Sequence, residues 1–440
     1  MAKLKNYNGR YCESEYESAF IAFLQSVGWT YLPGNKIKRC YRDVLIADDF
    51  RAFITKANTD LLEEEIEQIY DTVRLVGAES DFATLHKVYK WMVDGIQFTP
   101  QSGLPIQVTL IDFETPENNI FHVVNQLTVD YINNGQRENR RPDVLLYVNG
   151  MPLCIIELKN PADSHSTIYD AWEQITIRYW RDIPHLLHYC PLACISDGVK
   201  TRLGTVRTPY EHFYAWRRVN DADKISTMPF AETETMIKGV YAPERFLEIF
   251  RDYIYFQDEI FDCDEREIVC RYPQFFAVRL LKQSIIKSVM EQTGKGGTYF
   301  GATGCGKTYT MAFLARQLAL RCSDIPEIGS PTIVMIVDRD ELQEQGIKLF
   351  AKSKEFLNLG EVSIVKSRNN LRQELGSRES GGFYICTIQK FCDRKEDKIG
   401  LINDRHNIIC FSDEAHRTQL EHSRKIQFSK DADENMKAMV

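Results

Sequence analysis

The chain has 440 residues, of which 44% are hydrophobic and 26% are charged, and its formal net charge is −8. This composition excludes a largely disordered chain and predicts a globular protein of about two or three domains. The acidic balance also argues against a protein that coats nucleic acid over its whole surface. A local basic groove is compatible with it, and Arg137, Arg140, Arg141 and the stretch 200–207 are candidates for one. Solvated surface charge is the alternative interpretation of each.

The cysteine pattern and the lengths of the apolar runs indicate in which cellular compartment the protein is expected. The twelve cysteines are scattered without a C-x-x-C pair, so we expect neither a zinc site nor a disulfide framework. Cys305 lies inside a glycine-rich loop, which favours a reducing cytoplasm. No secretory signal is expected, and no apolar run approaches the ~20 residues of a membrane helix.

Residues 1–225 mix predicted helices with predicted strands. Apolar residues at helical spacing predict helices at 15–27 and 61–76. Predicted strands follow at 106–113, 121–131, 144–148 and 153–158. The last two runs are separated by Asn149-Gly150, which indicates a hairpin.

The pattern changes in the second half of the chain. Residues 226–264 are interpreted as a connector with a helix at 243–256. From residue 265 onward the pattern is strand, loop and helix, with a strand at 298–300, a helix at 308–321, and short apolar strands at 332–337 and 408–411. Continuous apolar strands are typical of buried parallel sheets, so residues 265–440 are predicted to form a doubly wound α/β lobe.

The stretch from Gly301 to Thr308 reads Gly-Ala-Thr-Gly-Cys-Gly-Lys-Thr and fits the phosphate-binding loop G-x-x-x-x-G-K-[ST] at every fixed position. Glycines allow backbone N–H groups to surround a phosphate chain, and the following helix directs its positive end at it. We therefore expect an ATP site. Its expected residues are Gly301, Thr303, Gly304, Gly306, Lys307 on the phosphates, and Thr308 on Mg²⁺.

Asp413-Glu-Ala-His416 follows an apolar strand about a hundred residues later. Asp413 is placed to hold the magnesium ion, and Glu414 is placed to orient the attacking water. Gln274 precedes the loop and has two open interpretations: an adenine-binding glutamine or an ordinary residue on a helix surface.

A second group of charged residues lies upstream, at Asp143, Glu157 and Lys159. Glu157 and Lys159 are two residues apart on a strand, so their side chains share a face. A buried strand that ends in charged residues is costly unless the charges are paired or bind something. Phosphodiester hydrolysis uses a metal ion held by carboxylates, so Asp143 and Glu157 are predicted metal ligands and Lys159 a catalytic amine.

The register of the hairpin tests this assignment. A strict two-residue turn at Asn149-Gly150 would place Asp143 opposite Ile156, on the wrong face. Asp143 can oppose Glu157 only if the strand pair contains one extra residue. Pro152 suits such an irregularity because it cannot donate to a ladder. We therefore predict a three-residue loop or a bulge between Asn149 and Pro152.

These motifs carry three resemblances. Asp413-Glu-Ala-His416, the segment 337–345 and the segment 387–391 resemble motifs of helicase superfamily 2, whose motors are built on RecA-like lobes. Arg141-Pro-Asp143 with Glu157-Leu-Lys159 resembles the PD-(D/E)xK nuclease superfamily. The whole chain, through 144–161, 195–198, 212–216 and 413–419, resembles the N-terminal part of the restriction and translocation (R) subunit of type I restriction-modification enzymes.

The family resemblance implies a PD-(D/E)xK nuclease domain at 1–225, the connector at 226–264, and the first RecA-like motor lobe at 265–440. It implies an ATP- and Mg²⁺-dependent enzyme of the bacterial or archaeal cytoplasm that translocates duplex DNA and cuts it away from its recognition site. Its implied partners are DNA and the methylation and specificity subunits. A second motor lobe would need roughly 150 more residues, so this chain alone is not expected to translocate.

The chain departs from the family pattern on the helix after Lys159. The family has a Gln and a Tyr four residues apart, whereas here Gln174 is followed by Tyr179 at five. In an α-helix this spacing rotates the ring away, so Gln174 is kept as a site residue and Tyr179 needs a bulged or ended helix. Glu17, on the first predicted helix, is a candidate additional acid, with a solvated helix charge as the alternative.

Two rival functions stay open at this point. One is a DNA- or RNA-remodelling helicase whose N-terminal domain binds without cutting. The other is a nucleotide-gated scaffold with no chemistry of its own.

Overall fold

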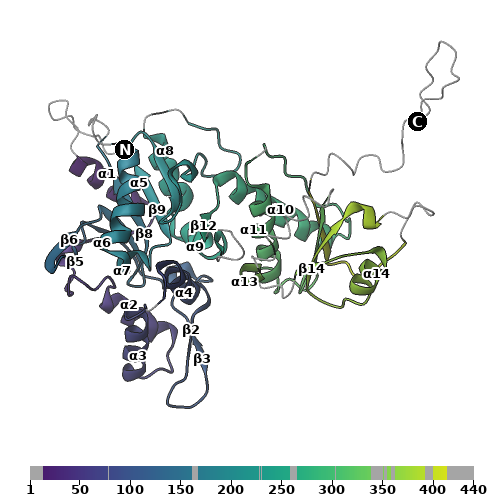
Figure 1. Cartoon of the computed structure of the whole chain (residues 1–440), viewed down its shortest axis with the longest axis horizontal. Helices are drawn as coiled ribbons and strands as arrows, with labels where there is room; N and C mark the ends of the chain where they lie inside the picture. Colours follow the sequence, from purple (N-terminus) through teal and green to yellow (C-terminus); the bar gives the residue numbers. More distant parts are fainter. Residues whose placement is uncertain are drawn as a thin grey trace, which may run out of the picture. The chain divides into compact units, whose positions relative to one another are not determined.

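The computed structural model describes residues 13–77, 79–160, 167–226, 228, 230–257, 265–302, 304–337, 350, 354–357, 362–391 and 400–413. The chain divides into two compact units, Met1–Pro273 and Gln274–Val440 (Figure 1). Both units are mixed α/β structures. None of the helices in these ranges is long and apolar enough to cross a membrane.

A six-stranded sheet forms the centre of the first unit, in the order β1-β4-β7-β8-β9-β10. Its strands are β1 (Thr30–Pro33), β4 (Phe121–Asn125), β7 (Val144–Val148), β8 (Met151–Leu158), β9 (Leu192–Ser196) and β10 (Thr201–Thr205). Every residue of β7 and β8 is buried, which explains their continuous apolar runs. β8 pairs with β7 antiparallel and with β9 parallel, so β8 lies inside the sheet.

Helices and a second pair of strands complete this unit. Helix α1 (Glu13–Ser26) contacts β1, β4 and β8, and α5 (Ile168–Glu173) contacts β8 and β9. The other helical segments are α2 (Ala47–Ala57), α3 (Glu63–Arg74), α4 (Asp81–Asp94), η1 (Gly34–Lys36), η2 (Pro116–Asn118), η3 (Gln174–Tyr179), α6 (Trp180–Asp182), α7 (Pro184–Leu187) and η4 (Tyr210–His212). Two short strand pairs lie outside the main sheet: β2 (Ile96–Phe98) with β3 (Ile106–Val108), and β5 (Val129–Asn133) with β6 (Gln136–Arg140).

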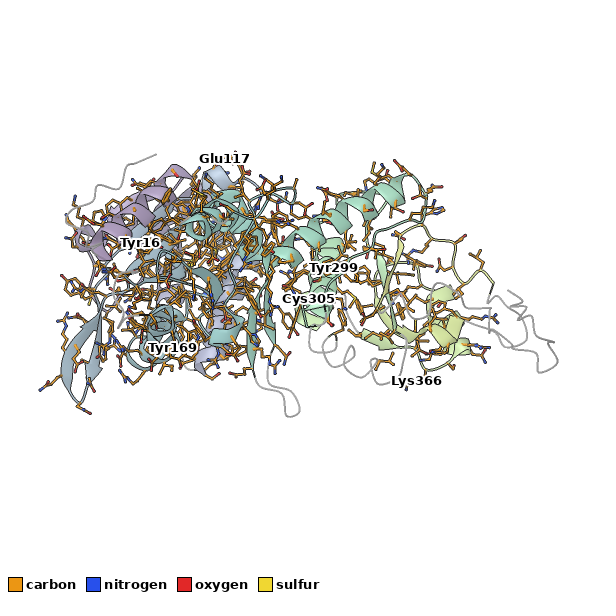
Figure 2. All side chains as sticks on the ribbon, turned by 90° about the horizontal axis from the view of Figure 1, so that it is seen from above. Tyr16, Glu117, Tyr169, Tyr299, Cys305 and Lys366 are labelled. Atoms are coloured by element: carbon orange, nitrogen blue, oxygen red, sulfur yellow. The ribbon has the colours of Figure 1, made fainter. Side chains whose placement is uncertain are left out.

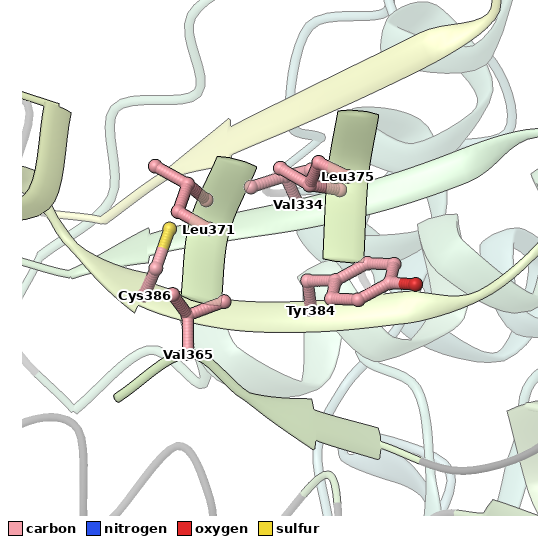
Figure 3. Close-up of a cluster of buried hydrophobic side chains, with 6 residues drawn as sticks. All are labelled: Val334, Val365, Leu371, Leu375, Tyr384 and Cys386. Carbon is pink, nitrogen blue, oxygen red and sulfur yellow. The ribbon is translucent and has the colours of Figure 1, made fainter. Parts of the chain in front are cut away.

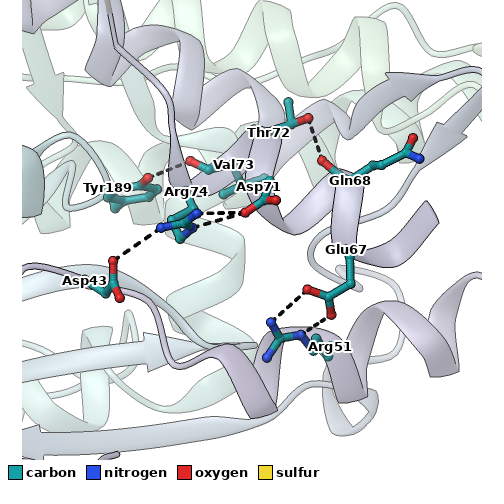
Figure 4. Close-up of polar contacts among 9 residues, drawn as sticks. All are labelled: Asp43, Arg51, Glu67, Gln68, Asp71, Thr72, Val73, Arg74 and Tyr189. Carbon is teal, nitrogen blue, oxygen red and sulfur yellow. Dashed lines mark hydrogen bonds and ion pairs between the residues drawn. The ribbon is translucent and has the colours of Figure 1, made fainter. Parts of the chain in front are cut away.

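Charged pairs join the helices that lie beside this sheet. Arg51 of α2 donates from Nη2 to Glu67 Oε2 of α3 at 2.9 Å (Figure 4). Arg74 contacts Asp71 within α3 and Asp43 before α2. These pairs are partly exposed, so each adds little stability, about 0–1 kcal/mol, and only the pair of Arg51 with Glu67 joins α2 directly to α3.

The segment interpreted as a connector contributes elements to the first unit. It contains α8 (Ala231–Val240), α9 (Pro243–Asp252) and β11 (Ile254–Gln257), which pairs with β12 (Arg266–Val269). Helix α8 contacts α1 and β10. The indole of Trp29 donates to the Tyr241 carbonyl at 2.6 Å, which ties the end of α8 to the residue preceding β1.

The second unit contains a four-stranded parallel sheet in the order β14-β15-β13-β16. Its strands are β13 (Thr332–Val337), β14 (Val362–Ile364), β15 (Phe383–Thr387) and β16 (Ile408–Ser412), and its helical segments are α10 (Tyr272–Met290), α11 (Lys307–Leu320), α13 (Lys354–Leu357), α14 (Arg368–Gly376) and η5 (Ile388–Phe391). Leu371 and Leu375 of α14 pack against Val334 and Tyr384 of the sheet (Figure 3). A parallel sheet with crossover helices is the architecture expected from the apolar strand pattern.

Several predicted elements end earlier than expected. The predicted strand 106–113 is confined to β3, and the run 121–131 divides into β4 and β5 at Gln126, whose φ is +49°. The predicted helix 243–256 ends at Asp252, and its last residues enter β11.

The predicted strand 298–300 is wrong, because these residues form no strand and Phe300 is 95% exposed. The run is only three residues long between glycines, so it offers few ladder bonds to offset the cost of ordering.

Candidate active site

One extra residue in β8 brings Asp143 opposite Glu157. Val148 pairs with Met151 and Tyr147 with Pro152 next to the turn, whereas Leu146 pairs with Cys154 beyond it. Leu153 is therefore the bulged residue. The predicted register is confirmed. The predicted position is wrong by one residue, because the turn itself has two residues and the bulge follows Pro152. The turn residues, Asn149 and Gly150, both have positive φ, as a tight hairpin turn requires.

The two acidic side chains meet at the carboxyl end of β8. The Asp143 backbone N–H donates to Glu157 Oε1 at 3.3 Å, and the Leu158 N–H donates to Asp143 Oδ2 at 2.9 Å. The Lys159 backbone N–H donates to the Ser196 carbonyl at 2.8 Å, so the β8–β9 ladder continues to the lysine. Backbone hydrogen bonds thus hold all three predicted nuclease residues in one place.

Gln174 connects the lysine to the buried acid. Lys159 Nζ donates to Gln174 Oε1 at 2.9 Å, and Gln174 Nε2 donates to Glu157 Oε2 at 2.7 Å. A side-chain amide suits this position because its oxygen accepts from an amine and its nitrogen donates to a carboxylate. The contact agrees with the choice of Gln174 as a site residue.

Tyr179 joins the same cluster because η3 is a π-helix. The segment Gln174–Tyr179 has i→i+5 geometry, so a residue five positions after Gln174 returns to the same face. Gln174 Nε2 donates to Tyr179 Oη at 2.6 Å, and Tyr179 Oη donates to Glu157 Oε1 at 2.8 Å. The sequence analysis allowed Tyr179 into the site only if the helix was bulged or had ended, and the structure contains such a bulged helix.

Gln126 is a site residue that the sequence did not indicate. It follows β4, its backbone N–H donates to the Asp143 carbonyl at 3.0 Å, and its Nε2 donates to Asp143 Oδ1 at 3.2 Å and to Glu17 Oε2 at 2.7 Å. Asn125 Nδ2 donates to Glu17 Oε1 at 2.6 Å. Glu17 is therefore linked to Asp143 through an amide and is not simply a solvated helix charge. A break in the apolar alternation at Asn125-Gln126 was the only available signal.

The electrostatics of this cluster centre on Glu157, whose side chain is fully buried. Burial raises the pKa of Glu157 well above its usual range, and the neighbouring Asp143 carboxylate raises it further, while Lys159 lowers it in part. Burial and the charge of Glu157 also raise the pKa of Tyr179 well above its usual range, so Tyr179 stays a neutral donor.

The donor set of this cluster fits a hard divalent cation. Carboxylate oxygens are the ligands that Mg²⁺ prefers, and a positive ion beside Asp143 and Glu157 would relieve the charge repulsion that favours protonation of Glu157. Within the described ranges no group of three or more His, Cys, Asp or Glu side chains is close enough to hold a metal ion. Asp143 and Glu157 would therefore supply only part of the ligand shell, which suits Mg²⁺ because it usually keeps several waters.

The glycine-rich loop lies in the second unit, directly before α11. Gly306 has φ +82° and caps the helix, which begins at Lys307, and Gly304 has φ +78°. Lys307 Nζ donates to the Gly301 carbonyl at 3.4 Å across the loop. Thr308 lies in the first helical turn. The arrangement of a left-handed glycine before a helix N-terminus is that of a phosphate-binding loop. Figure 2 marks Cys305 of this loop and the neighbouring Tyr299.

Gln274 contacts the loop backbone. Its side chain is 4% exposed, and its Nε2 donates to the Gly306 carbonyl at 3.0 Å. Gly306 has a φ of +82°, which favours glycine, and a Cβ there would lie 2.5 Å from that nitrogen, so a larger residue would push the Gln274 side chain away from the loop. Gln274 is thus not an ordinary helix-surface residue. The adenine-binding interpretation stays a prediction.

Asp413 follows β16, and its N–H donates to the Ile336 carbonyl of β13 at 2.9 Å. It therefore lies at the carboxyl edge of the parallel sheet, where α/β proteins bind ligands. The predicted residues Thr303 and Glu414, and most of the segment 337–345, lie outside the described residues.

Two family models match successive parts of the chain. Residues 10–212 match the family described as the type I restriction enzyme R protein N terminus, and residues 273–440 match the SWI2/SNF2 ATPase family. The chain is 31% identical over 436 residues to the type I restriction enzyme HindI endonuclease subunit of Haemophilus influenzae, covering 95% of this chain and 40% of the relative.

A second relative comes from an archaeon. The chain is 30% identical over 432 residues to the putative type I restriction enzyme MjaIXP endonuclease subunit of Methanocaldococcus jannaschii, covering 91% of this chain and 39% of the relative. The chain thus spans about two fifths of the length of these curated relatives. With an R-protein N-terminal domain followed by an ATPase domain, the chain belongs to the family of type I restriction enzyme R subunits.

Proposed function

We propose that this chain carries the DNA-cutting site and the ATP site of a type I restriction enzyme that cuts duplex DNA away from its recognition sequence. The observation that carries the proposal is the meeting of Asp143, Glu157 and Lys159 through Gln174 and Tyr179. Family membership supports it, and the proposed partners are duplex DNA and the methylation and specificity subunits, in the bacterial or archaeal cytoplasm.

At the cutting site, which we propose has a PD-(D/E)xK fold, Asp143 and Glu157 would hold Mg²⁺. The ion would supply an activated water and neutralise charge that develops on the phosphate. Gln174 and Tyr179 fix the orientation of Glu157, and Gln174 holds the Lys159 amine beside it. The amine is a positive group that can stabilise the developing charge on the phosphate or help to orient the water.

At the ATP site, which we propose lies on a RecA-like lobe, the loop from Gly301 to Thr308, Thr303 included, would hold the phosphates. Lys307 would contact the terminal phosphates, and Thr308 and Asp413 would hold a second Mg²⁺. Glu414 would orient the water that attacks the terminal phosphate. Hydrolysis would drive translocation of DNA by the complete enzyme, and Gln274 would support the loop.

The test uses the full-length subunit in the assembled complex, with supercoiled DNA cleavage and DNA-stimulated ATP hydrolysis measured on the same preparations. We expect Glu157→Ala and Lys159→Ala to abolish cutting while ATP hydrolysis persists, and Lys307→Ala to abolish both. Glu173→Ala and Lys224→Ala, at exposed positions of the same unit, are the matched controls.

Two results would separate this proposal from its rivals. If Glu157→Ala and Lys159→Ala still cut DNA, the proposed cutting site is wrong, and the interpretation as a remodelling helicase with a non-cleaving domain is favoured. ATP hydrolysis that persists in Lys307→Ala would leave a scaffold without a motor.

A further inference from the structure

The β5–β6 hairpin is a projecting ribbon that leads directly into the candidate cutting site. It occupies the chain between Gln126 and Asp143, whose backbones are hydrogen-bonded to each other at its base. Both strands lie outside the six-stranded sheet, and the ribbon extends from the edge of the first unit (Figure 1). Strands of five residues reach about 17 Å, which is roughly half of one turn of duplex DNA.

One face of the ribbon is fastened to the protein. Arg140 donates from Nε to Asp182 Oδ2 of α6 at 2.7 Å, and its guanidinium lies over the Tyr131 ring. The Tyr131 hydroxyl donates to Glu138 Oε2 at 2.5 Å, and Asn133 donates to the other oxygen of that carboxylate. These contacts brace the ribbon and neutralise the acidic group on this face.

The opposite face carries hydrogen-bond donors, one exposed apolar side chain and the buried carboxylate of Asp130, which is paired with Asn139 in the ladder. Because side chains alternate along a strand, Arg137 and Asn139 of β6 share this face, about 7 Å apart, and Arg141 follows directly after the strand. All three are exposed, and Ile132, paired with Arg137, is 66% exposed. Asn139 and Arg141 have no side-chain hydrogen bond or ion pair with any other residue that the structure describes, whereas Arg137 forms an ion pair with Asp130.

This combination fits duplex DNA better than a protein surface. Guanidinium and amide groups are the donors that bind phosphates and base edges, and a two-stranded ribbon fits a DNA groove. An isoleucine beside such donors has the chemistry of the apolar side chains that minor-groove proteins insert between bases. The row ends at Arg141, two residues before Asp143, so DNA along it would pass the carboxylates.

Resting on the proposed function, we propose that the β5–β6 hairpin is a DNA-binding arm, whose outer face of Ile132, Arg137 and Asn139, with Arg141 at its base, holds the duplex next to the cutting site. Its contribution is to keep the target phosphate beside Asp143 and Glu157 while the motor acts elsewhere on the DNA. The arm is not required for ATP hydrolysis.

Cleavage by the complete enzyme tests the arm. We expect Asn139→Asp combined with Arg141→Gln to slow cutting by about ten-fold or more, with a stronger loss as salt rises and with unchanged ATP hydrolysis, because donors to DNA are lost. Gln136→Glu makes the same amide-to-acid change on the fastened face of the same strand, and we expect it to cut normally. Equal cutting by the wild type, the double variant and Gln136→Glu would overturn the proposal of a DNA-binding arm.

Crosslinking identifies the partner directly. A photo-crosslinker on Ile132→Cys in the assembled enzyme, in a Glu157→Gln background that prevents cutting, should attach to DNA. The same reagent on Leu104→Cys, a comparably exposed apolar position at 75%, should not. Attachment of Ile132→Cys to another subunit and not to DNA would overturn the inference.

The two proposals fail in different ways. If Lys159→Ala still cuts, the proposed cutting site is wrong whatever the hairpin does. If Lys159→Ala is inactive while the hairpin variants cut normally and do not crosslink, the cutting site stands and the DNA-binding arm alone is wrong.

Discussion

Gln174 and Tyr179 are hydrogen-bonded to each other at 2.6 Å although they are five residues apart, because the helix between them is a π-helix. Both side chains then reach the same carboxylate, Glu157. π-helical turns are rare and occur frequently at functional sites. The i→i+5 geometry thus returns Tyr179 to the face of Gln174, which the same spacing would not do in an α-helix.

The first prediction concerns the hydroxyl of Tyr179. We expect Tyr179→Phe to slow DNA cutting by roughly ten-fold, since Glu157 loses a donor worth about 1–2 kcal/mol that fixes its orientation. ATP hydrolysis should not change. Tyr169→Phe is the control, because that ring is 46% exposed. Deletion of Ile177, which lies 51% exposed within the π-helix, would restore a spacing of four, and its cutting rate would show whether the π-helix itself is needed.

The second prediction concerns Gln126, which bridges Glu17 and Asp143. We expect Gln126→Ala to raise the Mg²⁺ concentration needed for half-maximal cutting several-fold, because the Asp143 carboxylate loses one of its donors and can rotate. Glu17→Gln should have a smaller effect, since the link that the described residues provide between Glu17 and Asp143 runs through Gln126. A larger defect in Glu17→Gln than in Gln126→Ala would contradict this order and indicate a direct role for Glu17.

The third prediction separates two roles of Gln274. Its Nε2 donates to the loop carbonyl of Gly306. If the side chain supports the loop, Gln274→Ala should raise the KM for ATP and for GTP by similar factors. If it binds adenine when nucleotide is present, the substitution should weaken ATP use alone. Steady-state hydrolysis of both nucleotides by the complete enzyme decides between these outcomes, and the loop contact favours the first.

The fourth prediction is a pH dependence of stability. Glu267 in β12 is fully buried, and burial raises the pKa of its carboxyl well above the usual range, with Thr205 and Arg207 opposing this only in part. A raised folded-state pKa means that the stabilising protonated form is complete below the unfolded pKa of about 4.5, and that stability is lost as the pH rises through the folded pKa.

Glu267→Gln removes that titration and keeps the shape of the protonated group. We expect the free energy of unfolding of the variant to exceed that of the wild type at pH 8, and the gap between the two proteins to be smaller near pH 5. Urea unfolding at both pH values, followed for the unit that contains Glu267, measures this. Glu265→Gln, at a partly exposed site two residues earlier, is the control. A variant that is less stable at pH 8 would show that Glu267 is charged and compensated in the folded protein.

The continuous apolar runs predicted β7, β8, β13 and β16 well, because a strand buried on both faces leaves an unmistakable pattern of residues. The need for one extra residue in β8 was also predictable, since two charged side chains on one buried face restrict the register. Its location at Leu153 was not, because a bulge is equally compatible with adjacent positions on a uniformly apolar strand.

The remaining misses have local physical causes. A π-helix cannot be predicted from a helical period of 3.6 residues. An α-helical reading of the sequence therefore places the Tyr179 ring away from the face that carries Gln174. Gln126 adopts a left-handed backbone that nothing in its neighbours requires. Its role arises from contacts with Glu17, which is more than a hundred residues away in the sequence. Short-range patterns do not carry such information.

Ser196 of β9 links Lys159, which follows β8, to the segment interpreted as a connector. Its carbonyl accepts a hydrogen bond from the Lys159 N–H. Its hydroxyl is hydrogen-bonded to the hydroxyls of Tyr16 of α1 and of Thr201, and the Thr201 hydroxyl is hydrogen-bonded to that of Thr233 of α8. A recombinant nuclease module that stopped at residue 225 would lack Thr233 and leave this buried chain of hydroxyls open at one end. A minimal cutting domain should accordingly be expressed through residue 273.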